Sequence, residues 1–520
     1  MHLFQMFDFL YNVTSKQIGD PMKNREIKRM VLITIAVIFA LMLPSCDRED
    51  INGLRYGFTT EPTTLDPLNP ANTADGRSIL FNVFEGLVKP DIQGRMQPCI
   101  AESWTIEQNG LVYNFLLRKE VFFHDGSIVN SADVKFSLDT AVSAGFDGLK
   151  NIEEVLILDE YHLSIILKSP DPEFLPYLTV GIVKAGNIER EKNVIGTGPF
   201  VIESYTPQRN LVLIKFNDYW QHNLPHLDKV TIVFFANYDT LMVAFRGGSI
   251  DGAFITGSMA AQLDHRNFDI FHNSSAAVQL LALNNAYAPL NDVRVRRAIN
   301  HGINVKGIID AAFFGAGTPS GSPIIPGLAA YHDNSLSYSY NPDLARSLLS
   351  QAGFNNTNRL SLEITVPSNF TMHVDTAQVI VSQLKEIGVD ANIKLVDWST
   401  WLSEVYFGRQ YQATIISLDS PTVSPRSFLT RYRSDDSNNF KNFNNADFDK
   451  VYDAALTETD TANRIRLYKD AQRIITENAA GVYIQDILYF TAFRGSVYGG
   501  ALNYPLYVID FASIYRIDNN

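Results

Sequence analysis

The feature that most constrains the fold is a change of hydrophobic period between residues 360 and 396. Apolar side chains occupy every second position in the run Leu360, Leu362, Ile364 and Val366, which predicts a strand. Residues 377–387 then carry apolar side chains at helical spacing and end at Gly388. Residues 389–395 return to period two. Two strands joined through a helix are expected to be parallel with a right-handed crossover, so the predicted class is α/β.

Other segments predict antiparallel hairpins and further helices. Residues 104–117 form two strand-like runs around Gln108-Asn109-Gly110, and Asn-Gly tolerates the positive φ of a tight hairpin turn. Residues 54–58 predict a short strand, and 461–478 predict a helix. Asp292 stands where it would cap the next helix. Gly196 and Gly198 are expected at a close backbone crossing that a Cβ would obstruct.

The N-terminal region predicts export from the cytoplasm. Four basic residues between 23 and 29 precede an uncharged apolar run, 31–43, that is too short to span a bilayer comfortably. The run ends in Leu43-Pro44-Ser45-Cys46, which resembles a bacterial lipobox. That resemblance implies a signal peptide over 1–45, with Met22 as an alternative start, an acylated Cys46 and a polar tether over 46–52. A leader that is cleaved elsewhere, or left uncut as an anchor, is the alternative.

Composition and motifs exclude several classes of function. The formal net charge is −13, and such an acidic surface repels phosphate backbones, so no nucleic-acid partner is expected. Cys99 is left alone if Cys46 is lipidated, which excludes an internal disulfide. The sequence has no Gly-x-Ser-x-Gly, His-Glu-x-x-His or Gly-Lys-Ser/Thr motif, so no enzyme, metal site or cofactor is predicted. His222 and His226 lie four apart, but Pro225 argues against one helical face.

Seven short segments, in order along residues 60–300, resemble the extracellular solute-binding proteins of peptide and nickel ABC importers, the family 5 type. They are 60–67 (TEPTTLDP), 84–87 (FEGL), 101–104 (AESW), the block 113–134 with FHDG and SADV, 196–200 (GTGPF), 217–220 (NDYW) and 292–296 (DVRVR). Each segment alone is weak evidence for the resemblance, but seven of them in the same order are hard to explain by chance. The resemblance continues more loosely to about residue 490.

The resemblance implies a periplasmic-binding-protein-like fold of type II, similar to cluster C, with two lobes, a hinge and an inserted extra domain. Lobe I would combine 51–84, 197–283 and 491–520, the inserted domain would span 85–196, and lobe II would span 284–490. The implied mechanism is hinge closure over a ligand. The closed, monomeric protein would then dock on an ABC permease with its ATPase. It would be lipid-anchored outside the cytoplasm, facing the periplasm in a Gram-negative host.

The resemblance also points to candidate ligand-binding residues near residue 419. In peptide-binding relatives an aspartate after a Gly-Trp pair binds the ligand's α-amino group. Here the matching stretch has Leu418 in place of the tryptophan, and Asp419 lies two residues out of register. Trp398 and Trp401 follow a predicted strand, and one of them is expected to face the cleft. The alternative for each is a place in the core.

Three charged residues complete the candidate set. Arg431 is a candidate for binding a ligand carboxylate through bidentate hydrogen bonds, and Arg409 is a further cation of the same region. The alternative for Arg431 is an ordinary exposed arginine. Glu61 belongs to the loop that crosses the cleft in relatives, where it would meet ligand side chains or cap the loop.

The predicted function is a substrate-binding lipoprotein that captures dipeptides and oligopeptides for an ABC importer. A nickel-chelate, haem or glycan binder on the same scaffold is one alternative. A sensory or adhesion receptor that has lost transport is another.

Overall fold

The computed structural model describes residues 52–91, 94–146, 148–420, 424–495, 498–499, 503–504 and 508–517. The predicted signal peptide, Cys46 and residues 47–51 of the predicted tether lie outside the described residues. No helix within the described ranges is long and apolar enough to cross a membrane.

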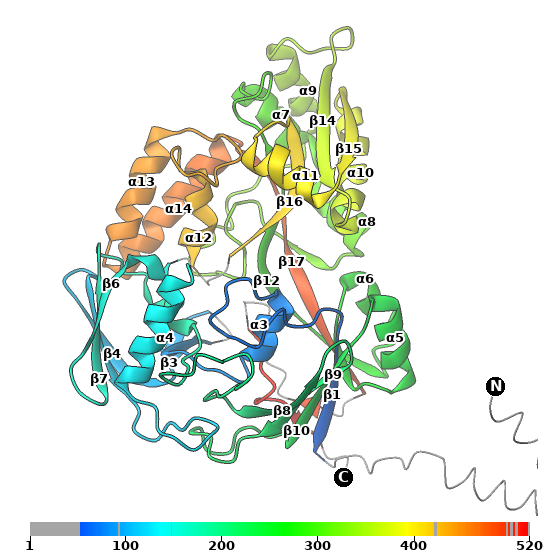
Figure 1. Ribbon diagram of the computed structural model, residues 1–520. Coiled ribbons are helices and arrows are strands. Elements are labelled where there is room, and N and C mark those ends of the chain that lie inside the picture. The colour runs from blue at the N-terminus through cyan, green and yellow to red at the C-terminus, as the bar shows by residue number, and fades with distance from the viewer. Residues whose placement is uncertain are drawn as a thin grey trace, which may run out of the picture. The chain divides into compact units, whose positions relative to one another are not determined.

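One mixed sheet of eleven strands runs through the chain from Leu54 onward (Figure 1). Its strands are β1 (Gly53–Phe58), β8 (Phe200–Thr206), β9 (Asn210–Lys215), β10 (Lys229–Phe234), β11 (Gly252–Ile255), β12 (Phe268–Leu283), β13 (Gly317–Pro319), β14 (Leu360–Pro367), β15 (Val389–Val396), β16 (Ala413–Asp419) and β17 (Gly481–Arg494). Their order is β15-β14-β16-β12-β17-β11-β1-β10-β9-β8, and β13 pairs with β17 off this path.

The two long central strands connect the two ends of this sheet. β12 pairs with β16 at one end, whereas β17 pairs with β11 at the other. Between Ser274 and Val278 the register of β12 against β17 shifts, and Ala276 there has a φ of +53°. Such an irregularity interrupts the ladder and lets the strand bend. The sheet therefore has a natural bending point midway along β12.

The predicted strand–helix–strand unit is confirmed. β14 and β15 are parallel in register from Leu360 opposite Val389 to Pro367 opposite Val396, and α10 (Thr371–Glu386) connects them. Three more helices pack against this end of the sheet, namely α7 (Val293–Gly302), α8 (Val305–Phe313) and α9 (Pro342–Gln351). Asp292 caps α7 as predicted, because its side chain accepts from the Arg294 amide.

A second sheet is separate from the first and fully antiparallel. It has the order β4-β5-β7-β6 and is built from β4 (Ala101–Glu107), β5 (Val112–Leu117), β6 (Ile152–Ile157) and β7 (His162–Leu167), with α4 (Ser131–Ser143) near it in Figure 1. The predicted hairpin is confirmed, since Gln108, Asn109 and Gly110 all have positive φ between β4 and β5.

The remaining elements are short or lie near the C-terminus. The helices are α3 (Ala74–Leu80), α5 (Tyr238–Gly247), α6 (Gly257–Ala260), α11 (Trp398–Thr400), α12 (Pro425–Leu429), α13 (Ala446–Thr457) and α14 (Thr461–Glu477), with η1 (Leu149–Asn151), η2 (Leu175–Thr179), the π-helix η3 (Trp401–Phe407) and η4 (Thr430–Tyr432). The strands are β2 (Val88–Pro90), β3 (Met96–Pro98), β18 (Tyr498–Gly499), β19 (Asn503–Tyr504), β20 (Val508–Ile509) and β21 (Tyr515–Arg516). The predicted helix over 461–478 is confirmed as α14.

The predicted backbone crossing at Gly196 and Gly198 is also confirmed. The Gly198 amide donates to the Val83 carbonyl over 2.9 Å. A Cβ added to Gly196 would lie 1.9 Å from that same carbonyl oxygen. Because no real Cβ tolerates such a distance, only glycine fits where this segment passes the end of α3.

Candidate functional site

A cavity of about 560 Å³ lies between segments that are far apart in the sequence. Residues 94–96, 172–173 and 175–176 line one side, and residues 327–331, 424–425 and Arg464 line the other. In Figure 1 the helices α12, α13 and α14 lie beside the smaller β4–β7 sheet at this place. The volume is in the range of cavities that hold small-molecule ligands.

An ion pair joins the two sides of the cavity. Arg426, on α12, donates from its guanidinium to Asp171, which follows β7. The Asp171 side chain is only 5% exposed, so its charge needs this partner. Burial lowers the pKa of Arg426, but the neighbouring Asp171 charge outweighs it and raises that pKa above its usual value. The Asp171 charge therefore favours the charged form of Arg426.

Glu173 makes a second connection between the same two parts. Its carboxylate accepts from the Tyr468 hydroxyl on α14, and its Oε1 lies 3.9 Å from Arg464 Nε. Burial raises the pKa of Glu173 to about 7, although the Tyr468 hydrogen bond and the charge of Arg464 oppose the rise. The side chain is thus a buried acid that titrates near neutral pH.

Asp419 lies at the junction between the two ends of the large sheet. It is the last residue of β16 and pairs with Ala277, next to the irregular part of β12. The pKa of Tyr489, on β17, is raised first by burial and then by the charge of Asp419. Tyr238 and Asp75, from the β1–β11 side of the sheet, raise the same pKa further. Tyr489 is therefore the residue on which charges from both ends of the sheet act.

The two predicted tryptophans lie one on the other. Trp398 and Trp401 stack with ring centres 5.0 Å apart and an angle of 5° between the rings. Trp401 is 2% exposed and donates from Nε1 to Thr414 Oγ1 over 2.9 Å, which places it in the core. Trp398 is 39% exposed and covers the outer face of Trp401.

The three other candidates occupy different surroundings. Arg409 donates to Asn442 Oδ1 and to the Ser437 carbonyl, so its guanidinium is held within its own end of the sheet. Glu61 accepts from the Tyr205 hydroxyl over 2.9 Å and from the Gln208 amide over 3.0 Å, which ties its loop to the β8–β9 hairpin.

Arg431 differs from both, since its guanidinium makes no hydrogen bond or ion pair with any described residue. Burial raises the pKa of Tyr406, the Arg431 charge lowers it, and the charges of Asp436 and Asp419 raise it. Trp401 packs against Tyr406 with ring centres 5.8 Å apart. Trp401 thus contacts Tyr406, and the charges of Arg431 and Asp419 act on that tyrosine, whereas Arg409 and Glu61 have other partners. Their ligand roles stay predictions.

Sequence reasoning missed the residues that connect the two sides of the cavity. These are Asp171, Glu173, Arg426, Arg464 and Tyr468. The one local signal is the acid-Pro-acid run at 171–173. Two carboxylates beside a proline after a strand indicate a loop that presents charged groups. Nothing in the sequence identifies their partners, which lie more than 250 residues away.

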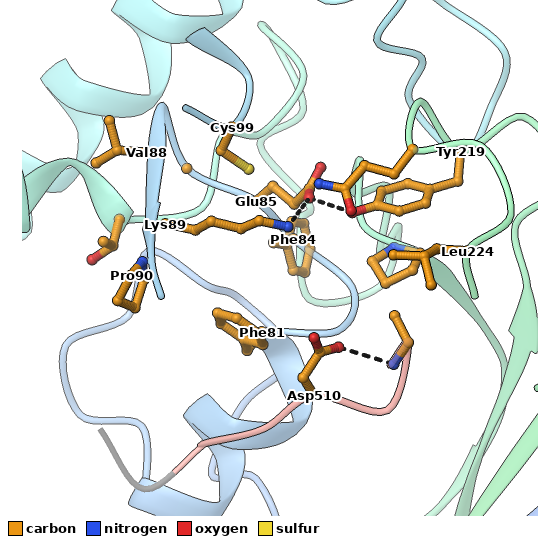
Figure 2. Close-up of a pocket in the computed structure, with 15 residues that line it drawn as sticks. Phe81, Phe84, Glu85, Val88, Lys89, Pro90, Cys99, Tyr219, Leu224 and Asp510 are labelled. Atoms are coloured by element: carbon orange, nitrogen blue, oxygen red, sulfur yellow. Dashed lines mark hydrogen bonds and ion pairs between the residues drawn. The ribbon is translucent and has the colours of Figure 1, made fainter. Parts of the chain in front are cut away.

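A second cavity, of about 40 Å³, is a packing feature of the scaffold (Figure 2). Glu85 accepts there from the Tyr219 hydroxyl and from Trp220 Nε1, both over 2.7 Å, and Lys89 Nζ lies 4.0 Å away. Such a volume holds about one or two water molecules. These bonds give a structural reason for two of the family-like segments, 84–87 and 217–220. The buried Glu85 carboxylate of the first segment accepts from both aromatic donors of the second. Cys99 is buried at the same cavity.

The sequence of residues 95–440 matches the model for bacterial extracellular solute-binding proteins, family 5 Middle. The chain belongs to this family. The glutathione-binding protein GsiB of Escherichia coli O1:K1 is 28% identical over 492 residues, which cover 88% of this chain and 92% of that protein. The protein is thus a solute-binding protein of the ABC importer type that works outside the cytoplasm, and its relatives are not enzymes.

Solved structures confirm the predicted fold class, a two-lobed periplasmic-binding-protein fold. HbpA2 from Haemophilus parasuis superposes with a TM-score of 0.80 at 23% identity, over 89% of this chain and 99% of that chain. DppA from Helicobacter pylori, in complex with the peptide STSA, has a TM-score of 0.70 at 25% identity, over 89% and 98%. NikZ from Campylobacter jejuni, in complex with Ni(L-His), has a TM-score of 0.73 at 23% identity, over 88% and 97%.

Proposed function

We propose that this solute-binding protein captures short peptides between its two lobes and delivers them to an ABC permease. The observation that carries the proposal is the similarity to a glutathione-binding protein over nearly the whole of both chains. The relative DppA, whose structure holds the peptide STSA, supports the same class of ligand. A cavity of about 560 Å³ has room for a ligand of that size.

The proposed closure turns about β12 and β17. Lobe I would comprise 51–84, 197–283 and 491–520, with 85–196 inserted, and lobe II would comprise 284–490. A ligand shifts the balance between open and closed forms only if it contacts both lobes in the closed form. The irregular stretch of β12 near Ala276 supports a hinge at this place, because its broken ladder resists bending less than a regular one.

Asp419 is the proposed partner of the ligand's amino group. Asp419 is exposed at the end of β16, and its carboxylate accepts no hydrogen bond from the residues that the structure describes. We further propose that Cys46 carries lipid and tethers the protein to the cell membrane. Acylation at two or more positions would make that attachment stable.

Native mass spectrometry of the protein purified from its own cells tests the proposal. A set of bound masses that differ by amino-acid residues is the expected result. A single bound mass of a metal chelate, haem or sugar, with no peptide, would overturn peptide capture and leave the family assignment untouched. Calorimetric titration with glutathione and with dipeptides then ranks the ligands.

A further inference from the structure

Five side chains form a cluster between two parts of the chain that the proposed closure would move against each other. Asp171 and Glu173 lie in the loop after β7, inside the proposed inserted domain. Arg426 lies on α12, and Arg464 and Tyr468 lie on α14, inside the proposed lobe II. All but Arg426 are at most 9% exposed. Separation at this place would expose both carboxylates to water and break the hydrogen bonds that they accept from α12 and α14.

The two carboxylates of this cluster are not equally well paired. Asp171 accepts from the guanidinium on α12, whereas the carboxylate of Glu173 accepts only from the Tyr468 hydroxyl among the described residues. Arg464 Nε lies 3.9 Å from Glu173 Oε1 and makes no hydrogen bond with a described residue. Nη1 of the same arginine already donates to the Glu458 carbonyl over 2.8 Å. Because a buried carboxylate with so few donors is costly to ionise, Glu173 favours its protonated form.

The charged and titratable groups around Glu173 come from both sides of the cluster. On its own side they are Asp171, Tyr113 of β5 and Arg95 of the turn between β2 and β3. On the other side they are Tyr331, Arg426, Tyr452 of α13, Arg464 and Tyr468. Arg95 is 70% exposed and paired with Asp91. Burial is the largest effect on the pKa of Glu173 and raises it to about 7, against the Tyr468 hydrogen bond and the charges of Arg464 and Arg426.

A movement that opens the cluster changes the proton affinity of Glu173. In water the carboxyl group has its ordinary pKa of 4.5, whereas in the cluster its pKa is about 7. Between these pH values the cluster therefore takes up a proton from solvent when it forms. Because the pKa is raised in the formed cluster, the stabilisation is fully present below pH 4.5 and is lost as the pH rises through about 7.

We propose that these five side chains form a proton-dependent latch, in which protonated Glu173 and the Asp171–Arg426 ion pair hold lobe II against the inserted domain in the closed form. The inference rests on the proposed closure and adds to it a contact outside the hinge strands β12 and β17. The proton comes from solvent, binds a carboxylate oxygen of Glu173, and returns to solvent when the lobes open. Ligands that bind the closed form are therefore held more tightly at pH 6 than at pH 8.

Small-angle X-ray scattering of the full chain without added peptide tests the latch apart from its ligand. Wild type is compared at pH 6 and pH 8 with Glu173→Gln, whose neutral side chain has nearly the same shape, and with Glu153→Gln, a change at an exposed acid of β6. We expect the radius of gyration of wild type and E153Q to be larger at pH 8, and that of E173Q to be the same at both values. A radius of wild type that does not change, or that changes equally in E173Q, would overturn the latch.

Tyr468→Phe supplies a second variant, which keeps the aromatic ring in place. Ionised Glu173 loses its hydrogen-bond donor in this variant, so its pKa in the latch should rise further. Across a pH series, the change in radius of gyration should then occur at higher pH than in wild type. A midpoint equal to that of wild type would mean that the tyrosine hydroxyl takes no part, which contradicts the latch.

Calorimetric titration with glutathione and with the dipeptide Ala-Phe separates the latch from peptide capture. Wild type and E153Q should bind up to about tenfold more weakly at pH 8 than at pH 6, whereas the affinity of E173Q should change much less. If neither peptide binds to wild type at either pH, peptide capture is wrong, and the scattering result decides the latch by itself. If the affinities of wild type and E173Q respond equally to pH, the latch is wrong and peptide capture stands.

Discussion

The Arg426 guanidinium on α12 donates a hydrogen bond to Asp171, a residue 255 positions earlier in the chain. The Tyr468 hydroxyl likewise donates to Glu173 across 295 positions. Both bonds join the segment after β7 to the helices that follow β16, and both border the 560 Å³ cavity. In the proposed closure, movement of one lobe against the other would act on these two contacts as well as on β12 and β17.

Removal of Arg426 should destabilise the protein through the partner that it leaves behind. In Arg426→Ala the Asp171 carboxylate stays buried without its cation, which we expect to cost roughly 2–4 kcal/mol of unfolding free energy. The double variant with Asp171→Asn should recover part of this loss, because no charge is then left unpaired. Urea unfolding of the two single variants and the double variant measures the coupling. Strictly additive effects would mean that the pair contributes nothing.

Glu173 should make stability depend on pH around neutrality. Its pKa is raised by burial to about 7 from an ordinary 4.5, so the folded state holds a proton that the unfolded state releases. The contribution of Glu173 to the unfolding free energy is therefore fully present below pH 4.5 and is lost as the pH rises through about 7. Glu173→Gln should raise the unfolding temperature more at pH 8 than at pH 5.

The exposed Glu153, on β6, provides the control, and Glu153→Gln should leave the pH profile as it is. In both variants the unfolding temperature should still depend on pH because of Asp486, whose pKa burial raises to about 6. If the unfolding temperatures of E173Q and wild type change with pH in the same way from pH 5 to pH 8, Glu173 is ionised in the folded state throughout that range.

The two stacked tryptophans should differ sharply in their effect on stability. Trp401→Ala opens a cavity in the core and leaves Thr414 without its donor, which should cost roughly 3–5 kcal/mol. Trp398→Ala removes a side chain that is 39% exposed and should cost about 1 kcal/mol. Guanidinium unfolding measures both. Equal losses would show that Trp398 is as much a core residue as Trp401.

The glycine at the backbone crossing should not tolerate even a methyl group. In Gly196→Ala the new Cβ would lie 1.9 Å from the Val83 carbonyl oxygen, so either the loop before β8 or the turn after α3 must shift, at a cost of roughly 3 kcal/mol or more. Gly247, the last residue of α5, has open space around it, and Gly247→Ala should stabilise by up to about 0.5–1 kcal/mol. Thermal unfolding of the two variants shows whether the loss at position 196 comes from the steric clash, since Gly247→Ala makes the same change without one.

Elements with a local signal were predictable from the sequence. The β14–α10–β15 unit follows from a hydrophobic period of 2, then 3.6, then 2, and the turn at 108–110 follows from residues that tolerate positive φ. Short-range rules suffice for both, because each element's neighbours lie close in the chain. The seven segments that resemble family 5 predicted the two-lobed fold, and the family match and the solved structures confirm that fold.

The contacts around the cavity were not predictable in this way. Asp171 and Arg426 are single charged residues without periodicity, and a pairing across 255 positions depends on the whole fold. Glu61 illustrates the same limit, since its loop was identified correctly but its hydrogen bonds to Tyr205 and Gln208 come from a distant hairpin. Lys441 is fully buried, although it stands in a stretch rich in asparagine, which by composition predicts an exposed lysine.

Small-angle X-ray scattering of the protein with and without a saturating mixture of glutathione and dipeptides tests the central claim most directly. Closure of the two lobes about β12 and β17 predicts a smaller radius of gyration and a shorter maximum dimension when peptides are bound. Profiles that superpose at peptide concentrations shown by calorimetry to saturate the protein would contradict capture by closure.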